Sequence, residues 1–150
     1  MLTNGVKKCR IYVYRKSEEV IMINVGMKNS VEINVTENDT AKAFGSGELD
    51  VLATPRMISL MEQASAECIA KELSCELSSV GTHIDVKHLS ATPVGMKVIA
   101  TAEVVACEDR KIVFKVSAYD QCGLIGEGDH ERFIINKEKF ISKTYNKLQK

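Results

Sequence analysis

The sequence of 150 residues contains no tryptophan, only four tyrosines and four phenylalanines, and no excess of charge of either sign. Its 20 lysines and arginines balance 20 aspartates and glutamates, and no basic stripe is interleaved with aromatic residues. The chain therefore lacks the electrostatic surface that nucleic-acid binding requires. No apolar run approaches the ~20 residues that cross a bilayer, so we expect neither nucleic acid nor a membrane among its partners.

The cysteines form no metal-binding or disulfide pattern. They are odd in number, widely separated and never spaced as CxxC: Cys9, Cys68, Cys75, Cys107 and Cys122. Scattered cysteines of this kind are typical of reduced thiols in a cytoplasmic protein, and they offer no zinc site. The 45% of hydrophobic residues suits one globular domain of ordinary size.

Residues 1–20 are basic, but we do not expect them to form a signal peptide. The apolar stretch that follows, Val20 to Val25, is too short for a hydrophobic signal core, and no small-residue cleavage site comes after it. We interpret residues 1–20 as a disordered or dispensable extension, and residues 21–150 as the folded domain.

The clearest structural signal is an amphipathic helix that starts at Thr54 and Pro55. Threonine is a good N-cap and proline is favoured at the first helical position, and Arg56–Leu73 contains neither glycine nor proline. Residues spaced three and four apart form a wide face that includes Met57, Leu60, Met61, Ala64 and Cys68, widened by Ile58, Ser65 and Ile69. So wide a face predicts a helix largely enclosed by other structure.

Segments typical of strands lie on both sides of this helix. One precedes it, at Ser30–Thr36, and four follow it: Ser78–Ser90, Lys97–Glu108, Lys111–Asp120 and Leu124–Asn136. The links between the four are short, so these strands must be antiparallel. Residues 137–150 are expected to form a short terminal helix. This order predicts an α+β protein in which a five-stranded antiparallel sheet wraps around one long helix, as in a hot-dog fold.

Two titratable residues fall among the apolar positions. Glu62 lies within the apolar side of the helix, and His88 ends an inward stripe that starts with Val80, Thr82, Ile84 and Val86. A glutamate that reaches water at the rim, and a strand-end histidine that makes a structural hydrogen bond, are the plainer interpretations. Because the two elements must pack together, the alternative is a converging pair for acid–base or nucleophilic chemistry.

A metal site is not expected. His83, Asp85 and His88 are close in sequence, but strand alternation directs the first two away from His88, and no further ligand is nearby. The serine nucleophile motif G-x-S-x-G is also absent.

The last predicted strand contains Gly126 and Gly128. Glycine weakens a strand and often marks the close approach of a ligand or of neighbouring backbone. Both glycines share a strand face with His130 and Arg132. We therefore expect a ligand or neighbouring backbone to come close to the strand on the face of these two polar residues.

Four motifs, in order along the chain, resemble the fluoroacetyl-CoA-thioesterase-like branch of the hot-dog thioesterases. They are Val51–Glu62, Ser79–Thr82 with Val86–Leu89, Ala91–Gly95 and Ile125–Arg132, and the match runs from about Val31 to Phe140. The resemblance implies a hot-dog fold and hydrolysis of an acyl-CoA without metal or organic cofactor. It further implies that a Thr, a Glu and a His act together, and these fall on Thr54, Glu62 and His88.

The resemblance also implies substrate contacts and an assembly. A glycine near the thioester carbonyl falls on Gly81, an arginine near the active site falls on Arg132, and the sites lie at the interface of a homodimer. An exposed sheet edge needs cover, which also favours a dimer. The chain departs from the family at Asp129, where threonine is usual, and a carboxylate there is expected to pair with Arg132. The fluoroacetyl specificity is not carried over, because the loop before Val51 shows no clear match.

Two other functions remain open. A hot-dog hydratase or dehydratase also uses a histidine and an acid around an acyl thioester, and a non-catalytic acyl-CoA-binding module keeps the tunnel without turnover. The Thr-Pro helix start favours the thioesterase, since addition of water to an enoyl group needs no such hydroxyl. We therefore expect a cytoplasmic thioesterase acting on short or medium acyl-CoA. The sequence leaves open whether an acyl-enzyme forms or water attacks directly.

Overall fold

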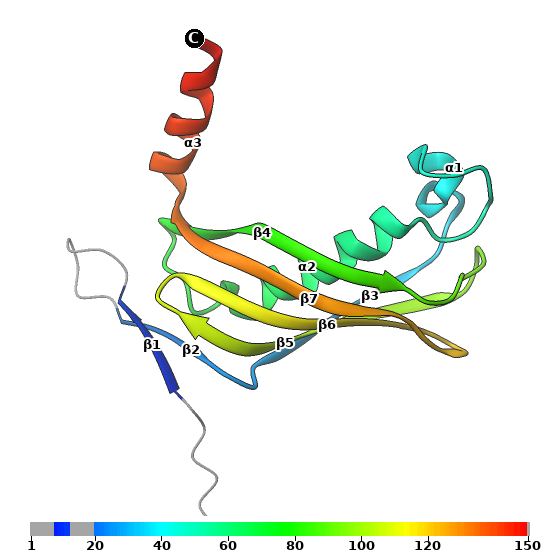
Figure 1. Cartoon of the computed structure of the whole chain (residues 1–150), viewed down its shortest axis with the longest axis horizontal. Coiled ribbons are helices and arrows are strands. Elements are labelled where there is room, and N and C mark those ends of the chain that lie inside the picture. Colours follow the sequence, from blue (N-terminus) through cyan, green and yellow to red (C-terminus); the bar gives the residue numbers. More distant parts are fainter. Residues whose placement is uncertain (1–7, 13–19, 150) are drawn as a thin grey trace, which may run out of the picture.

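The computed structural model describes residues 8–12 and 20–149 of the chain (Figure 1). Five strands form one antiparallel sheet in the order β3-β5-β6-β7-β4. Their bounds are β3 Lys28–Asn34, β4 Leu77–His88, β5 Lys97–Glu108, β6 Lys111–Asp120 and β7 Gly123–Asn136. The long helix α2, Thr54–Ala70, packs along one face of this sheet. The predicted α+β arrangement, a five-stranded antiparallel sheet on one long helix, is therefore confirmed.

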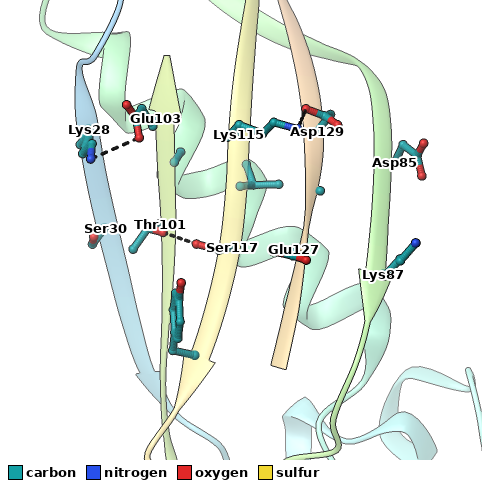
Figure 2. A pocket seen from close by; sticks show the side chains of 14 residues that line it. Lys28, Ser30, Asp85, Lys87, Thr101, Glu103, Lys115, Ser117, Glu127 and Asp129 are labelled. Carbon is teal, nitrogen blue, oxygen red and sulfur yellow. Dashed lines mark hydrogen bonds and ion pairs between the residues drawn. The ribbon is translucent and has the colours of Figure 1, made fainter. Parts of the chain in front are cut away.

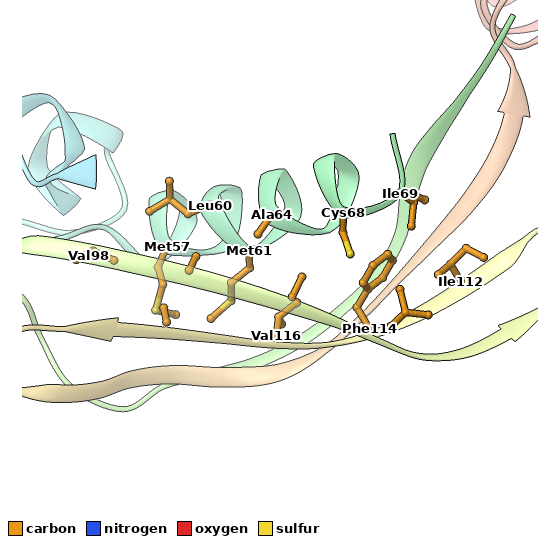
Figure 3. Close-up of a cluster of buried hydrophobic side chains, with 14 of the residues drawn as sticks. Met57, Leu60, Met61, Ala64, Cys68, Ile69, Val98, Ile112, Phe114 and Val116 are labelled. Atoms are coloured by element: carbon orange, nitrogen blue, oxygen red, sulfur yellow. The ribbon is translucent and has the colours of Figure 1, made fainter. Parts of the chain in front are cut away.

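Helix α2 buries the face that its residue spacing predicts. Its buried residues are Met57, Leu60, Met61, Ala64, Ser65, Cys68 and Ile69. They pack against apolar residues of the sheet, among them Val98, Ile112, Phe114 and Val116 (Figure 3). Full burial of one such large apolar side chain stabilises the fold by roughly 1.5–3 kcal/mol. This two-layer contact therefore fixes the helix against the sheet.

The ends of several elements differ from the prediction. Helix α2 begins with Thr54 as its first residue and ends at Ala70; its N-cap is Ala53, and no side chain makes a capping hydrogen bond. The predicted N-cap role of Thr54 is therefore wrong, and its hydroxyl is available to another partner. Strand β3 runs from Lys28 to Asn34, two residues earlier than expected. The terminal helix α3, Lys137–Tyr145, is followed by a short 3₁₀ helix η2, Asn146–Gln149.

Part of the expected N-terminal extension is a strand. Strand β1, Lys8–Tyr12, pairs antiparallel with β2, Val20–Asn24, whereas residues 1–7 and 13–19 lie outside the described residues. Strand β2 in turn places Ile21 and Ile23 in the core. The expected disorder therefore does not apply to Lys8–Tyr12, and the dispensability of the extension stays a prediction.

A β-bulge in β4 changes which of its residues face the helix. The pairing of β4 with β7 shifts its register between Gly81 and His83, which makes Thr82 the extra residue. A Cβ atom built on Gly81 would point at Glu62 of α2, so Gly81 faces the helix. The prediction that Val80 faces inward and Gly81 outward is wrong, because one extra residue reverses the alternation before the bulge.

The segment between β3 and α2 is tied to the first turn of the helix. It contains the short helices η1, Glu37–Asp39, and α1, Ala41–Phe44. Arg56 Nε donates to Asp39 Oδ1 at 2.7 Å, and the backbone N–H of Thr36 donates to Asp39 Oδ2 at 2.8 Å. Burial alone would raise the pKa of Asp39, but these hydrogen bonds and the Arg56 charge outweigh it and hold that pKa below 3.8.

Asp39→Asn is expected to destabilise the protein by about 1–3 kcal/mol near neutral pH, because it removes a charge-assisted hydrogen bond. Since the folded state lowers the pKa of Asp39, its contribution is present above the unfolded value near 3.8 and is lost as the pH falls through the lower folded value. Urea unfolding of the wild type and Asp39→Asn across this pH range measures the effect. A difference in unfolding free energy that does not shrink at acid pH would contradict this reading.

Candidate active site

The first residue of α2 and the last residue of β4 form a side-chain pair. Thr54 Oγ1 lies 2.7 Å from His88 Nδ1. Thr54 is exposed and His88 is half-buried, so a substrate can reach the hydroxyl while the imidazole is partly screened from water. A hydroxyl within hydrogen-bond reach of an imidazole is the arrangement of a nucleophile, or a proton donor, with its base.

The second ring nitrogen of His88 has no partner among the described residues. If Nδ1 accepts the Thr54 hydroxyl proton, Nε2 carries the ring proton, and Nε2 is buried without a hydrogen bond. A buried donor left without an acceptor costs about 1–3 kcal/mol. An acceptor for this proton is therefore expected from a substrate or from a second copy of the chain.

The start of α2 adds an electrostatic feature to this pair. No side chain caps the helix, so N–H groups of the first turn and the positive end of the helix dipole remain available beside Thr54. Such groups stabilise a carbonyl oxygen that becomes an oxyanion.

A second polar cluster lies further along the inner face of the sheet, around Gly81. The position of a Cβ atom on Gly81 is 2.7 Å from Glu62 Oε1, 3.1 Å from His130 Cε1 and 3.7 Å from Arg132 Nη1. Because glycine has no side chain, these three groups from α2 and β7 can approach one another over its backbone. The bulge in β4 is what places Gly81 on this face.

Arg132 is a buried guanidinium held by three contacts. It is 8% exposed; Nε donates to Ser79 Oγ and Nη2 to Ser79 O, both at 2.8 Å, and Nη1 lies 3.3 Å from His130 Nε2. Burial lowers the pKa of Arg132, and the charge of Glu62 opposes this. Arginine stays protonated in proteins, so a fixed positive charge lies beside the Glu62 carboxylate.

Of the residues predicted for the site, the structure brings Thr54 together with His88, and Glu62 together with Gly81 and Arg132. It does not bring Glu62 to His88 within one chain. Eight residues separate Thr54 from Glu62, which is about 12 Å along a helix, and the Glu62 carboxylate lies over Gly81 instead. The predicted convergence of Glu62 and His88 therefore does not occur inside one chain.

Two other expectations for β7 have clear outcomes. Asp129 does not pair with Arg132: it forms an ion pair of 2.7 Å with Lys115 on the outer face of the sheet, because adjacent strand residues point to opposite faces. A Cβ atom on Gly126 would lie 2.6 Å from Met57, and one on Gly128 would overlap the backbone oxygen of Asp85. The expected close approach at both glycines is thus made by neighbouring chain segments.

His130 is the site residue that the sequence reasoning missed. It was noted only for sharing a strand face with Gly126, Gly128 and Arg132. Its fully buried side chain contacts the Arg132 guanidinium. The available signal was a histidine two residues before an arginine in a strand that is otherwise apolar on that face.

A broad hollow lies on the outer face of the sheet, the face that does not contact α2 (Figure 2). Its volume is about 770 Å³, and its charged lining is largely paired, as in Lys28–Glu103 at 3.2 Å and Lys115–Asp129 at 2.7 Å. Neither Thr54, Glu62 nor His88 lines it, so it is not the active site. Among residues 8–12 and 20–149, no group of three or more His, Cys, Asp or Glu is placed to hold a metal ion, and no helix is long and apolar enough to span a membrane.

The sequence comparisons assign the chain to a family. Residues 35–138 match the family described as fluoroacetyl-CoA-specific thioesterase. The fluoroacetyl-CoA thioesterase of Streptantibioticus cattleyicolor is 43% identical over 98 residues, which cover 65% of this chain and 70% of that enzyme. The chain belongs to this thioesterase family. The predicted resemblance and the predicted class, a thioester hydrolase acting on acyl-CoA, are therefore confirmed.

Structural comparison agrees with this family assignment. The fluoroacetyl-CoA thioesterase FlK superposes with a TM-score of 0.79 at 35% identity, covering 83% of this chain and 97% of FlK. A thioesterase superfamily member from Thermus thermophilus superposes with a TM-score of 0.76 at 28% identity, covering 83% and 92%. A hot-dog-like protein from Thermanaerovibrio acidaminovorans, at 22% identity and a TM-score of 0.75, covers 82% and 91% and shares the fold.

Proposed function

We propose that this member of the thioesterase family hydrolyses short acyl-CoA thioesters to a free acid and CoA, using Thr54, His88 and Glu62. The observation that carries the proposal is the 2.7 Å contact between Thr54 Oγ1 and His88 Nδ1 at an uncapped helix start. A short acyl group is supported by the relatives: FlK structures contain acetyl-CoA in one case, and fluoroacetate with CoA in another.

In the proposed reaction, the C–S bond of the thioester breaks, a C–O bond forms with oxygen that comes from water, and CoA leaves as a thiol after gaining a proton. Free N–H groups at the start of α2 stabilise the carbonyl oxygen as it becomes an oxyanion. His88 accepts a proton from the Thr54 hydroxyl or from water. Glu62, next to the Arg132 charge, acts as a base or attacks the carbonyl carbon.

We further propose that two copies of the chain form each site. Thr54 and His88 of one protomer would meet the Glu62 carboxylate of the second, because about two helical turns separate Thr54 from Glu62 within a chain. Two observations support an assembly at this place. Strand β4 is an edge of the sheet, and its central residues Gly81, Thr82 and His83 are exposed. An unpaired edge is a template for pairing with another chain.

The cytoplasmic location is likewise a proposal, supported by the free thiols of Cys68, Cys75 and Cys122.

Release of free thiol from a series of acyl-CoA substrates tests the proposed activity. We expect saturable turnover with acetyl-CoA and other short acyl groups, and slower turnover as the chain lengthens. Enoyl-CoA serves as the discriminating substrate: a change in enoyl absorbance without thiol release would identify a hydratase. Saturable binding of acyl-CoA with neither signal would identify a binding module and refute the proposal.

A further inference from the structure

The hydrogen bonds of His130 define one protonation state. Its side chain is fully buried, Nδ1 lies 2.7 Å from the backbone oxygen of His83, and Nε2 lies 3.3 Å from Arg132 Nη1. A carbonyl oxygen only accepts and a guanidinium only donates. His130 is therefore a neutral imidazole that donates from Nδ1 and accepts at Nε2. The ring is also fixed by Phe114, whose ring stacks at a centroid distance of 6.2 Å.

The bulge in β4 supplies the acceptor for this histidine. The register of β4 against β7 shifts between Gly81 and His83, and His83 O lies next to the imidazole of His130. Bulges reorient backbone and side-chain groups locally. The same irregularity turns Gly81 toward Glu62, so one extra residue in the strand builds both sides of the cluster.

We propose that His130 is a positioning residue: it holds the Arg132 guanidinium beside Glu62, so that the carboxylate stays oriented for the reaction. This inference rests on the proposed function, in which Glu62 is the base or nucleophile. His130 does not contact substrate in this role. It acts through Arg132: two contacts from Nε and Nη2 go to Ser79, and His130 Nε2 is the hydrogen-bond partner of Nη1.

The charged groups around His130 agree with this role. The pKa of His130 lies below 6.5, mainly because the side chain is buried. The hydrogen bond to His83 O and the charge of Glu62 raise this pKa, whereas the charges of Arg132 and the His83 imidazole lower it. The faces of β5 and β6 that contact α2 contribute apolar residues, including Phe114, Val116, Ala100 and Ala102. No other charge from these two strands therefore competes for the guanidinium.

Two substitutions at His130 separate positioning from packing. His130→Leu fills a similar volume and removes the acceptor for Arg132, whereas His130→Gln keeps an acceptor that does not titrate. We expect His130→Leu to lower kcat by roughly 10- to 100-fold, as small displacements of catalytic groups do, with little change in KM. His130→Gln should stay close to the wild type in both respects.

Asp129→Asn is the matched control. It is adjacent to His130 on the same strand, but it faces the outer surface and pairs with Lys115, so kcat and KM should not change. His130→Met provides a second apolar replacement, should the leucine variant fail to fold.

The outcomes are distinct. An apolar variant that folds and keeps the wild-type kcat overturns the positioning role. A lowered kcat that the glutamine variant shares shows that His130 acts only through packing and also overturns it. If the wild type releases no thiol from any acyl-CoA, the proposed function itself fails, and the His130 variants play no part in that result.

A stability measurement tests the protonation state of His130 without depending on enzyme activity. Because folding lowers the pKa of His130, the unfolded state binds more protons below about pH 6.5, and the folded protein loses stability as the pH falls through the folded value. His130→Gln should remove this part of the pH dependence in urea unfolding between pH 7 and pH 5, relative to Asp129→Asn. An unchanged slope would show that His130 is not held neutral, and would overturn the hydrogen-bond assignment.

Discussion

Glu62→Gln and His88→Ala are each expected to lower kcat by roughly 10²–10⁴-fold, the usual effect of removing a positioned acid, base or nucleophile. Glutamine keeps the size of Glu62 but has no charge to act as a base or attack a carbonyl. Alanine at position 88 removes the group that lies 2.7 Å from the Thr54 hydroxyl. Thiol-release kinetics give the rates, and circular dichroism with thermal unfolding shows whether each variant is folded.

A mixture of the two variants tests where the site lies. If Thr54 and His88 of one copy work with Glu62 of the other, a dimer of one Glu62→Gln chain and one His88→Ala chain contains one intact site. Random pairing at equal amounts then restores about a quarter of the wild-type activity, since half of the dimers are mixed and each has one intact site of two. If all three residues act within one chain, every site in the mixture lacks one of them.

The results separate the activity from the assembly. Either single variant that folds and keeps most of its thiol release shows that its residue is structural. Two inactive variants that do not complement each other, after unfolding and refolding together to exchange subunits, would keep the catalytic roles but place the whole site within one protomer. Light scattering that gives a monomer mass for a fully active sample would lead to the same conclusion.

The fold was predictable from the sequence because its two main signals are local. The spacing of Met57, Leu60, Met61 and Ala64 reports directly on one buried helix face. The short links between β5 and β6 and between β6 and β7 allow only antiparallel neighbours, as their registers confirm. Both signals predict the same fold even when the ends of the helices and strands are misplaced by one or two residues.

The arrangement around Gly81 was not predictable in the same way. Strand alternation is a rule with a period of two, so one extra residue at Thr82 reverses every assignment before it. The one sign of the bulge in the sequence is Gly81, since a glycine inside a strand often marks one, but the stripe from Val80 to His88 continued through it. His88 follows the bulge, and its inward direction was therefore predicted correctly, whereas Gly81 precedes it and was assigned to the wrong face.

The position of Glu62 relative to His88 was missed for a reason of distance. A helical wheel reports the direction of a side chain around the axis but not its height along it. Glu62 lies about two turns beyond Thr54, and it meets residues from the middle of β4 and β7, whereas His88 is at the end of β4. Only the pairing of the strands shows which residues of β4 and β7 lie beside a given turn of α2.

Thr54→Val is expected to lower kcat by about 10²-fold or more, the loss typical of removing a group that takes part in proton transfer, and to leave the fold intact. The reason lies in the start of α2. Ala53 is the N-cap and Thr54 makes no capping hydrogen bond, so valine, which has the same shape, removes the hydroxyl without removing a cap. The lost hydrogen bond to His88 contributes about 1 kcal/mol, which corresponds to a decrease in Tm of about 2–4 °C for a chain of this size.

Thr54→Ser is the control for this prediction, because it keeps the hydroxyl and loses only a methyl group from an exposed position. It should retain much of the turnover and nearly all of the thermal stability. Turnover by Thr54→Val near the wild-type rate would show that the hydroxyl is not catalytic. The 2.7 Å contact would then serve only to orient His88, and the chemistry would rest on His88 and Glu62 with water as the attacking group. Loss of turnover in the valine variant alone would instead assign the Thr54 hydroxyl to the reaction itself.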